Sequence, residues 1–324
     1  MKRVVKIALI AAVSSIAAGT VFFVTALAAV GGDFRKFNTT KYHTETYDVD
    51  GEFDKISVKT NTTADIVFEP STDGACAVVC RESEKIKYAV SVQDGALQIN
   101  GTDTRKWYDR LFSFGENEKL TVQIPSGEYS SLFMDTDVGD ICISKEYSFT
   151  TLTVKTDTGD VECFASASDS MKIDVDTGDI TAADFTAGAA EFSTDTGHVR
   201  LSGLNCGKIS VNTDTGRANL SNVTCDSLIV TVDTGDVSVK NVIVSGALTV
   251  ETDTGDVRLE KSDAATLSIK TDTGDVTGTL LTEKTFDAKA STGDVDVPKT
   301  SFGGVCKIRT DTGDICIKIE GENG

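Results

Sequence analysis

Carboxylates recur at a fixed spacing from residue 132 onward, and their number and arrangement are what could do chemistry in this chain. One column of them consists of Asp137, Asp157, Asp176, Asp195, Asp214, Asp233, Asp253, Asp272 and Asp311. A second column includes Asp140, Asp160, Asp236, Asp256, Asp275 and Asp294. Carboxylate oxygens are preferred calcium ligands, and a pair of carboxylates can hydrolyse a glycosidic bond. Asp also caps tight turns, so three roles have to be compared.

The elements that must position these carboxylates follow from a repeated phrase, Thr-Asp-Thr-Gly-Asp-Val. Its glycines succeed one another at steps of 19 or 20 residues, and they are Gly139, Gly159, Gly178, Gly197, Gly216, Gly235, Gly255, Gly274, Gly293 and Gly313. A fixed period of this size indicates a repeat array, in which each unit buries its apolar face only by stacking on its neighbours.

Apolar and polar residues alternate on both sides of each glycine. The positions seven and five residues before it hold pairs such as Leu228 and Val230, and those two and four residues after it hold pairs such as Val237 and Val239. A period of two is typical of a strand with one buried face. We therefore expect an all-β fold: a right-handed, two-sided β-solenoid of about ten coils of 19–20 residues over residues 132–324.

In such a solenoid each Asp column would stack at roughly 4.8 Å, where neighbouring carboxylates repel by about 0.9 kcal/mol in bulk water. His198 and Arg217 interrupt the second column, and hydrogen bonds from backbone amides can satisfy the remaining carboxylates. A single Asp-Gly-Asp edge offers few of the roughly six to eight oxygens that calcium takes. The pattern favours turn-capping Asp residues and assigns no metal ligand and no cofactor; weak calcium binding is the alternative.

Threonines flank the first Asp column. Thr-Asp-Thr triplets are complete at six corners, for example Thr213-Asp214-Thr215. The first threonine of each triplet has the same parity as the buried apolar columns. We therefore expect an inward ladder whose hydroxyls bond to the backbone, and not an outward ice-binding face.

The N-terminal residues form a membrane segment by composition. Residues 7–30 are uncharged and mostly apolar, and Lys2, Arg3 and Lys6 precede them. A segment of this length can span a bilayer, and the basic side stays in the cytoplasm. We expect residues 1–32 to be a cytoplasmic basic end plus a retained transmembrane signal anchor; signal-peptidase cleavage at Ala26-Leu27-Ala28 is the alternative.

The remainder of the chain is strongly acidic. Without its three N-terminal basic residues it carries 28 Lys and Arg against 50 Asp and Glu, a net charge of −22. Such a charge repels phosphate backbones, so nucleic acid is excluded as a partner.

Between the anchor and the repeats, the sequence predicts a polar tether over residues 33–52 and an N-terminal cap over residues 53–131. The cap begins with a degenerate coil in which Ala64 replaces the repeat glycine. An Asp94-Gly95 hairpin signal lies farther along. The aromatic residues of segment 107–114 are expected in the core of the cap, which closes an otherwise open end of the solenoid.

Eight cysteines in an exported protein permit disulfides without specifying them. Cys206 and Cys225 each lie ten residues before a repeat glycine, so they should lie side by side on successive coils and could form a bridge. The sequence contains no Cys-X-X-Cys spacing and two histidines, so a metal cluster is not supported.

Three features together resemble a known bacterial family. They are an N-terminal anchor ending in Gly-Gly-Asp, the phrase Leu-Thr-Val-Gln-Ile-Pro at 120–125, and the repeated Asp-Thr-Gly-Asp-Val. The family is a β-strand-repeat domain of unknown function named "putative adhesin", and the resemblance covers nearly the whole chain. It implies a bacterial cell-membrane protein that crosses the membrane once, with its N-terminus in the cytoplasm and its C-terminal domain outside. It carries over no functional residues.

The leading hypothesis is a non-enzymatic envelope or cell-surface interaction protein whose partner is a polymer or a protein that the sequence does not identify. A calcium-responsive envelope scaffold is one alternative, and a polysaccharide-acting β-helix enzyme is another. An enzyme would need a local acid–base constellation that departs from the repeat. The outward polar residues vary without clustering, so no catalytic residue is predicted.

Overall fold

The computed structural model describes residues 2–29, 31–32, 41–72, 74–106 and 118–321. Its helix α1 (Lys2–Ala29) contains a 25-residue apolar stretch, Val5–Ala29, with a mean hydropathy of 2.3 and no burial against the rest of the described chain. This stretch is long and apolar enough to cross a membrane, and a signal sequence meets the same criteria. The predicted apolar N-terminal helix is therefore confirmed.

The N-terminal cap combines parallel strands that extend the coils with antiparallel strands that cover them. Its strands are β1 (His43–Asp48), β2 (Lys55–Thr60), β3 (Asp65–Pro70), β4 (Ala77–Glu82), β5 (Ile86–Gln93), β6 (Ala96–Asp103) and β7 (Lys119–Ile124). The predicted degenerate coil is β2 and β3, and it lies between the first repeat coil and the pair β6 and β7. Antiparallel β5 then covers β6, while β4 and β1 cover β7.

Some details of the cap differ from the sequence predictions and others agree. Asp94 and Gly95 form the predicted hairpin turn, with φ of 51° and 72°. Strand β1 lies inside the segment 33–52 for which a tether is predicted, so any tether is shorter than expected. The predicted aromatic cluster at 107–114 lies outside the described residues.

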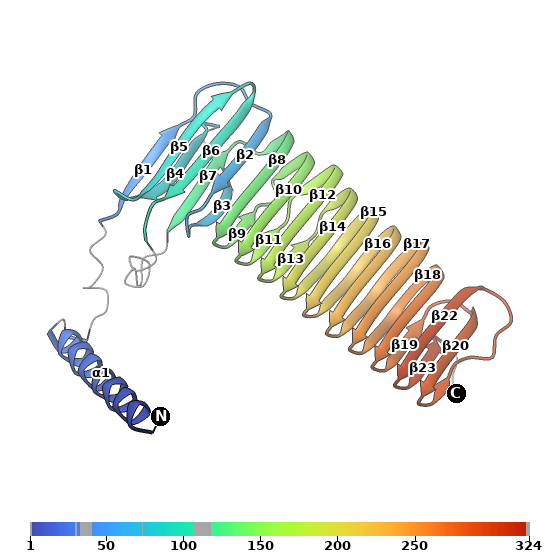
Figure 1. Cartoon of the computed structure of the whole chain (residues 1–324). Helices are drawn as coiled ribbons and strands as arrows, with labels where there is room; N and C mark the ends of the chain where they lie inside the picture. The colour runs from blue at the N-terminus through green and yellow to red at the C-terminus, as the bar shows by residue number, and fades with distance from the viewer. Residues whose placement is uncertain (1, 30, 33–40, 73, 107–117, 322–324) are drawn as a thin grey trace.

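From β8 onward each coil contributes a short strand after the repeat glycine and a long strand before the next one (Figure 1). The short strands are β9 (Ile141–Ile143), β11 (Val161–Cys163), β13 (Ile180–Ala183), β19 (Val276–Leu280), β21 (Val295–Asp296) and β23 (Ile315–Ile319). The long strands are β8 (Gly127–Val138), β10 (Tyr147–Thr158), β12 (Ser166–Thr177), β14 (Thr186–Thr196), β20 (Lys284–Thr292) and β22 (Gly304–Thr312). In the middle coils both runs join into β15 (Val199–Thr215), β16 (Ala218–Thr234), β17 (Val237–Thr254) and β18 (Val257–Thr273). The predicted β-solenoid of about ten coils is confirmed.

Like positions of successive coils stack in parallel register. Val230 is paired with Val211 on one side and with Val250 on the other, as the sequence predicts, and all three are buried. The stacking lines up inward columns that are mainly Leu, Ile and Val, and these form one continuous core from the cap to the last coils. Full burial of each such side chain stabilises the fold by about 1.5–3 kcal/mol.

A second corner follows each short strand in the middle coils. The residue six positions after the repeat glycine has positive φ in five consecutive coils, and these residues are Asp184, Gly203, Asn222, Asn241 and Lys261. Asn and Asp tolerate this left-handed backbone better than most residues. The Asn241 side-chain amide also donates to the Asn222 side-chain carbonyl at 3.1 Å, so this corner too stacks in register.

The threonine column is an inward ladder, as predicted. Its buried members are Thr136, Thr156, Thr194, Thr213, Thr252, Thr271 and Thr310. The hydroxyl of Thr194 donates to the carbonyl of Gly178 at 3.0 Å, and three other members bond to repeat-glycine carbonyls in the same way. The hydroxyl of Thr213 is buried without a hydrogen-bond partner among the described residues.

This difference predicts opposite effects for two identical substitutions. Thr213→Val should raise the free energy of unfolding by about 1 kcal/mol, because it removes an unsatisfied buried hydroxyl at a position where the next coil already carries Val232. Thr194→Val should lower it by about 1 kcal/mol, because it removes a made hydrogen bond. Paired thermal melts of the two variants test this, and equal shifts in the same direction would contradict it.

The last two coils stack in the reverse of their order in the chain. Strand β22 lies between β18 and β20, and β23 lies between β19 and β21 (Figure 1). The coil of Gly293 is therefore the outermost one, beyond the coil of Gly313. Lys284 at the start of β20 is buried and forms an ion pair with the buried Asp263 of β18 at 2.5 Å. This pair ties the outermost coil back across the strand that separates it from β18.

A buried ion network fastens the cap. The Arg105 guanidinium forms an ion pair with Asp103, at 2.8 Å between Nη2 and Oδ2, and a second one with Glu118, at 2.6 Å between Nη1 and Oε1. All three side chains are at most 4% exposed. The hydroxyls of Tyr42 and Thr63 bond to both Arg105 and Glu118. Burial alone would lower the pKa of Arg105, but hydrogen bonding to Asp103 and the charge of Glu118 raise it.

Candidate functional site

The Asp column directly after the repeat glycine is an amide-capped ladder. The backbone N–H of Asp160 donates to Oδ1 of Asp140 at 2.9 Å, and the N–H of Asp179 donates to Oδ1 of Asp160 at 2.8 Å. The same bond recurs in the later coils, from Asp256 to Asp236, Asp275 to Asp256, Asp314 to Asp275 and Asp294 to Asp314. Asp65 of the degenerate coil starts the ladder by accepting from the Asp140 amide at 3.1 Å. Each carboxylate thus caps the turn of the next coil.

The two non-acidic members of this column fit the same arrangement. Nδ1 of His198 accepts from the backbone N–H of Arg217 at 3.0 Å, so an imidazole nitrogen takes the place of a carboxylate oxygen. Burial alone would raise the pKa of Asp179, but hydrogen bonds from Arg200 and from the His198 amide lower it. Arg217 forms an ion pair with Asp236 at 3.2 Å. These contacts relieve the repulsion within the column at its middle.

The other Asp column, two residues before the glycine, does not cap the corner. Its members lie at the outer surface, and Asp272 forms an ion pair with Lys270 at 3.0 Å. Turn capping therefore belongs to the column after the glycine. Within the described ranges, no group of three or more His, Cys, Asp or Glu side chains converges in a way that could hold a metal ion.

The stacked cysteines lie where the sequence places them. Cys206 and Cys225 are direct partners on β15 and β16, both are buried, and both are free thiols. Burial raises the pKa of Cys206 to about 11 and that of Cys225 to about 12. Since the thiolate is the reactive form, these thiols are poor nucleophiles at neutral pH.

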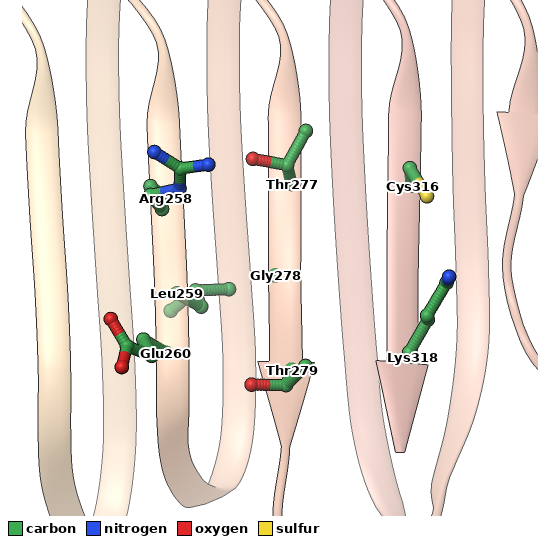
Figure 2. A pocket seen from close by; sticks show the side chains of 8 residues that line it. All are labelled: Arg258, Leu259, Glu260, Thr277, Gly278, Thr279, Cys316 and Lys318. Atoms are coloured by element: carbon green, nitrogen blue, oxygen red, sulfur yellow. The ribbon is translucent and has the colours of Figure 1, made fainter. Parts of the chain in front are cut away.

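An open groove of about 400 Å³ interrupts the outer face of the short strands near the C-terminal end (Figure 2). The side chains that line it come from β18, β19 and β23, and they are Arg258, Leu259, Glu260, Thr277, Thr279, Cys316 and Lys318, with the backbone of Gly278 between them. Gly278 stands in the column that holds Leu259 on one side and Ile317 on the other. A Cβ there would collide with the carbonyl oxygen of Leu259, so the strand sits too close to its neighbour for any side chain.

The groove presents mainly hydrogen-bond donors. Arg258 and Lys318 lie on opposite sides of the Gly278 strand, with the hydroxyls of Thr277 and Thr279 between them (Figure 2). Neither cation has an ion pair within the described part of the chain. Glu260 at the rim is held by Lys240 at 2.8 Å, and this hydrogen bond lowers its pKa. The arrangement suits anionic or hydroxyl-rich groups.

Comparison with known proteins places these features in a family. The model of the Toastrack DUF4097 family matches residues 53–241 and 205–324, which together include every coil and all of the cap except β1. This chain belongs to the Toastrack family. Among curated proteins, none matches the Toastrack chain.

Several solved structures share the Toastrack fold at low sequence identity. A "putative adhesin" from Parabacteroides distasonis is 11% identical over 84% of this chain and 98% of its own, with a TM-score of 0.51. A "putative lipid binding protein" from the same species is 15% identical over 74% of this chain and 98% of its own, with a TM-score of 0.52. A "putative adhesin" from Parabacteroides merdae is 11% identical over 74% and 96%, with a TM-score of 0.51. At these identities the likeness shows the fold.

Sequence reasoning missed the groove, although a sign of it is present. The position four residues after the repeat glycine is Leu220, Val239, Leu259 and Ile317 in other coils, and Gly278 breaks that column. A glycine inside a strand often marks a close approach of another backbone. The cap network was also missed, because Asp103, Arg105 and Glu118 have no repeat to place them.

Proposed function

We propose that this Toastrack protein is a non-enzymatic interaction protein of the bacterial cell envelope, held in the membrane by α1, which binds an envelope or surface polymer or protein. The observation that carries the proposal is the donor-lined groove on β18, β19 and β23, at the end of the solenoid away from the cap. A stack of coils holds this groove rigidly and at a distance from the N-terminal segment. The names of the similar structures, two of which are called "putative adhesin", support the class.

The chemistry of the groove narrows the ligand class. Two cations that form no ion pair among the described residues, together with two hydroxyls, match sulfate, phosphate, carboxylate or sugar hydroxyl groups along an extended chain. The exported part as a whole has a net charge of −22 and would repel an anionic polymer away from the groove. The ligand that fits is therefore a glycan with anionic groups, bound locally at the groove.

A binding test of the full-length protein in liposomes, against isolated cell-wall, glycan and host-surface fractions, checks this function. We expect one fraction to bind, and the double variant Arg258→Ala/Lys318→Ala to bind at least about tenfold more weakly, because each charge-assisted hydrogen bond contributes about 1.5–3 kcal/mol. The matched control is Lys155→Ala/Lys208→Ala, which removes two exposed lysines from the long strands. Equal binding by both double variants would contradict the groove as the site.

A polysaccharide-acting enzyme is less well supported by the same groove. A glycoside hydrolase needs one carboxylic acid with a raised pKa beside a second carboxylate. Glu260 is the carboxylate in the groove, and its hydrogen bond to Lys240 lowers its pKa, which is the wrong direction for a general acid. Binding is therefore the better supported use of the groove.

A calcium-responsive scaffold remains the second candidate, and it predicts a large effect of calcium. We expect a small one, because one oxygen of most carboxylates in the column after the glycine already accepts an amide hydrogen bond. The melting temperature should rise by no more in millimolar calcium than in sodium of equal ionic strength. A calcium-specific rise above about 10 °C would favour the scaffold, since ligand binding stabilises by mass action.

Retention of the anchor is a separate expectation. The apolar stretch Val5–Ala29 is long enough to span the hydrocarbon core, so the mature protein should keep it and partition with membranes. Intact-mass and N-terminal analysis of the membrane fraction from the native host measure this directly. A mature N-terminus at Ala29 would show cleavage and release.

A further inference from the structure

The two ends of the solenoid are finished differently. At the N-terminal end, antiparallel β5 and β4 cover the outermost parallel strands β6 and β7. At the C-terminal end, β20 pairs with β22 and β21 pairs with β23, and no strand within the described residues pairs with their other edges. The connection from β21 to β22 reaches the start of β20, where the Thr300 hydroxyl donates to the Lys284 carbonyl.

The side chains of this last coil show that its end is open. Phe286, Ala288 and Ala290 on β20 are only partly buried, whereas their partners Cys306 and Ile308 on β22 are fully buried. Val295 on β21 is 43% exposed, against 1% for its partner Ile315. Exposed apolar residues gather here, namely Leu281, Val295, Phe302 and Val305. An unpaired strand edge with half-buried core residues is a template for another strand.

The sequence of β20 is complementary to itself when it runs antiparallel to a second copy. With a two-fold axis at Ala288, Asp287 of each copy lies opposite Lys289 of the other. The same register sets the large Phe286 opposite the small Ala290 on the inward face. Opposite charges and large–small pairs directly across an antiparallel ladder are stabilising. We propose that β20 pairs with β20 of a second copy of this chain, which joins two solenoids end to end.

Neighbouring registers lack this complementarity. An axis at Asp287 would set two Asp287 carboxylates face to face, and an axis at Lys289 would do the same with two ammonium groups. Like charges directly opposite each other are destabilising. Arg309 on β22 already contacts the carboxylate and the carbonyl of Asp287, yet the Asp287 side chain is 62% exposed and stays open to a second cation.

The proposed pairing also continues the core. A two-fold axis perpendicular to the sheet keeps the inward face of both copies on the same side, so Phe286, Ala288 and Ala290 of the two copies meet over a shared interior. The two N-terminal helices then lie at opposite ends of the pair. If α1 is held in a membrane, which rests on the proposed function, the two copies belong to two facing membranes, and the contact joins cells through identical proteins.

The full-length protein in detergent tests the pairing without relying on the anchor. Sedimentation should give twice the chain mass of 34.3 kDa after correction for detergent. Asp287→Lys and Lys289→Asp should each weaken self-association at least about tenfold, because each creates two like-charge pairs by symmetry. The double variant Asp287→Lys/Lys289→Asp should restore self-association, although, like Asp287→Lys alone, it lacks the Asp287–Arg309 ion pair.

Controls make each outcome decisive. Lys155→Asp changes the net charge as Lys289→Asp does but lies on β10, whose two edges are already paired with β8 and β12, so it should leave the dimer intact. A monomeric wild-type protein at about 100 µM, or single variants that dimerise as well as the wild type, would overturn the β20 pairing. Two separately labelled populations of proteoliposomes should tether to each other with the wild type, the Lys155→Asp control and the double variant, but not with Asp287→Lys or Lys289→Asp alone. Dimers in detergent without tethering would keep the pairing and contradict the membrane-anchored orientation.

Discussion

Gly235→Ala is expected to disrupt the solenoid at its centre, with a loss of more than about 4 kcal/mol in local stability. Gly235 has φ of 146°, and a Cβ at this corner would be driven into the carbonyl oxygen of Gly216 on the preceding coil. That oxygen belongs to a backbone that is fixed by ladders on both sides, so it cannot move away. The coils on either side would have to separate.

Gly127→Ala is the matched control for this substitution. Gly127 has nearly the same φ, 154°, but a Cβ there meets nothing within 4 Å. It should therefore cost only the backbone strain of about 1–3 kcal/mol. Because repeat arrays need not unfold in one step, amide hydrogen exchange resolved to β16 and β17 is the proper measurement. Similar exchange rates in the two variants would show that close stacking of the corners is not what demands glycine.

Arg105→Met is expected to unfold the N-terminal cap. The substitution keeps much of the side-chain volume but leaves the buried carboxylates of Asp103 and Glu118 without their cation. Removing one partner of a buried ion pair typically costs about 3–5 kcal/mol. Thermal melts and limited proteolysis of the full-length protein should show cleavage inside the cap, while the coils after β10 stay protected.

Arg200→Met is the control for the loss of a guanidinium. Arg200 pairs with Asp179 at 2.8 Å, but its side chain is 47% exposed, and surface pairs of this kind contribute about 0–1 kcal/mol. A cap that is equally stable in both variants would mean that the network around Arg105 adds no more than a surface pair.

The repeat made most of the fold predictable from the sequence. Period-two columns around each glycine give the strands, and the constant step of 19 or 20 residues gives parallel stacking in register, as the Val211, Val230 and Val250 pairing confirms. Even the degenerate coil was predictable, because Ala64 and Asp65 keep the corner pattern. In a repeat array the same interactions, within a coil and between neighbouring coils, are encoded in every copy, so the sequence pattern that predicts them is strong.

The repeat pattern does not predict where the array of coils ends or which coils deviate from the pattern. The reversed order of the last two coils depends on the pairing of β22 with β18, and nothing in the spacing of Gly293 and Gly313 distinguishes the two orders. The Asp column before the glycine and the one after it look alike as sequence, yet only the second caps corners, because that choice depends on where each carboxylate points. The groove depends on the backbone approach at Gly278.

The reversed order at the C-terminal end also sets the order in which the last coils can form their ladders. Each long strand from β10 to β18 pairs with the long strand that precedes it in the chain, so its ladder can form as soon as it follows. Strand β20 emerges next, but its ladder partner β22 comes some twenty residues later in the chain. The long strand of the ninth coil therefore has no ladder partner until the tenth coil has paired with β18. Only then can the ninth coil add as the outermost layer. The outermost layer of the stack is thus the last to form, although its residues precede those of the coil beneath it.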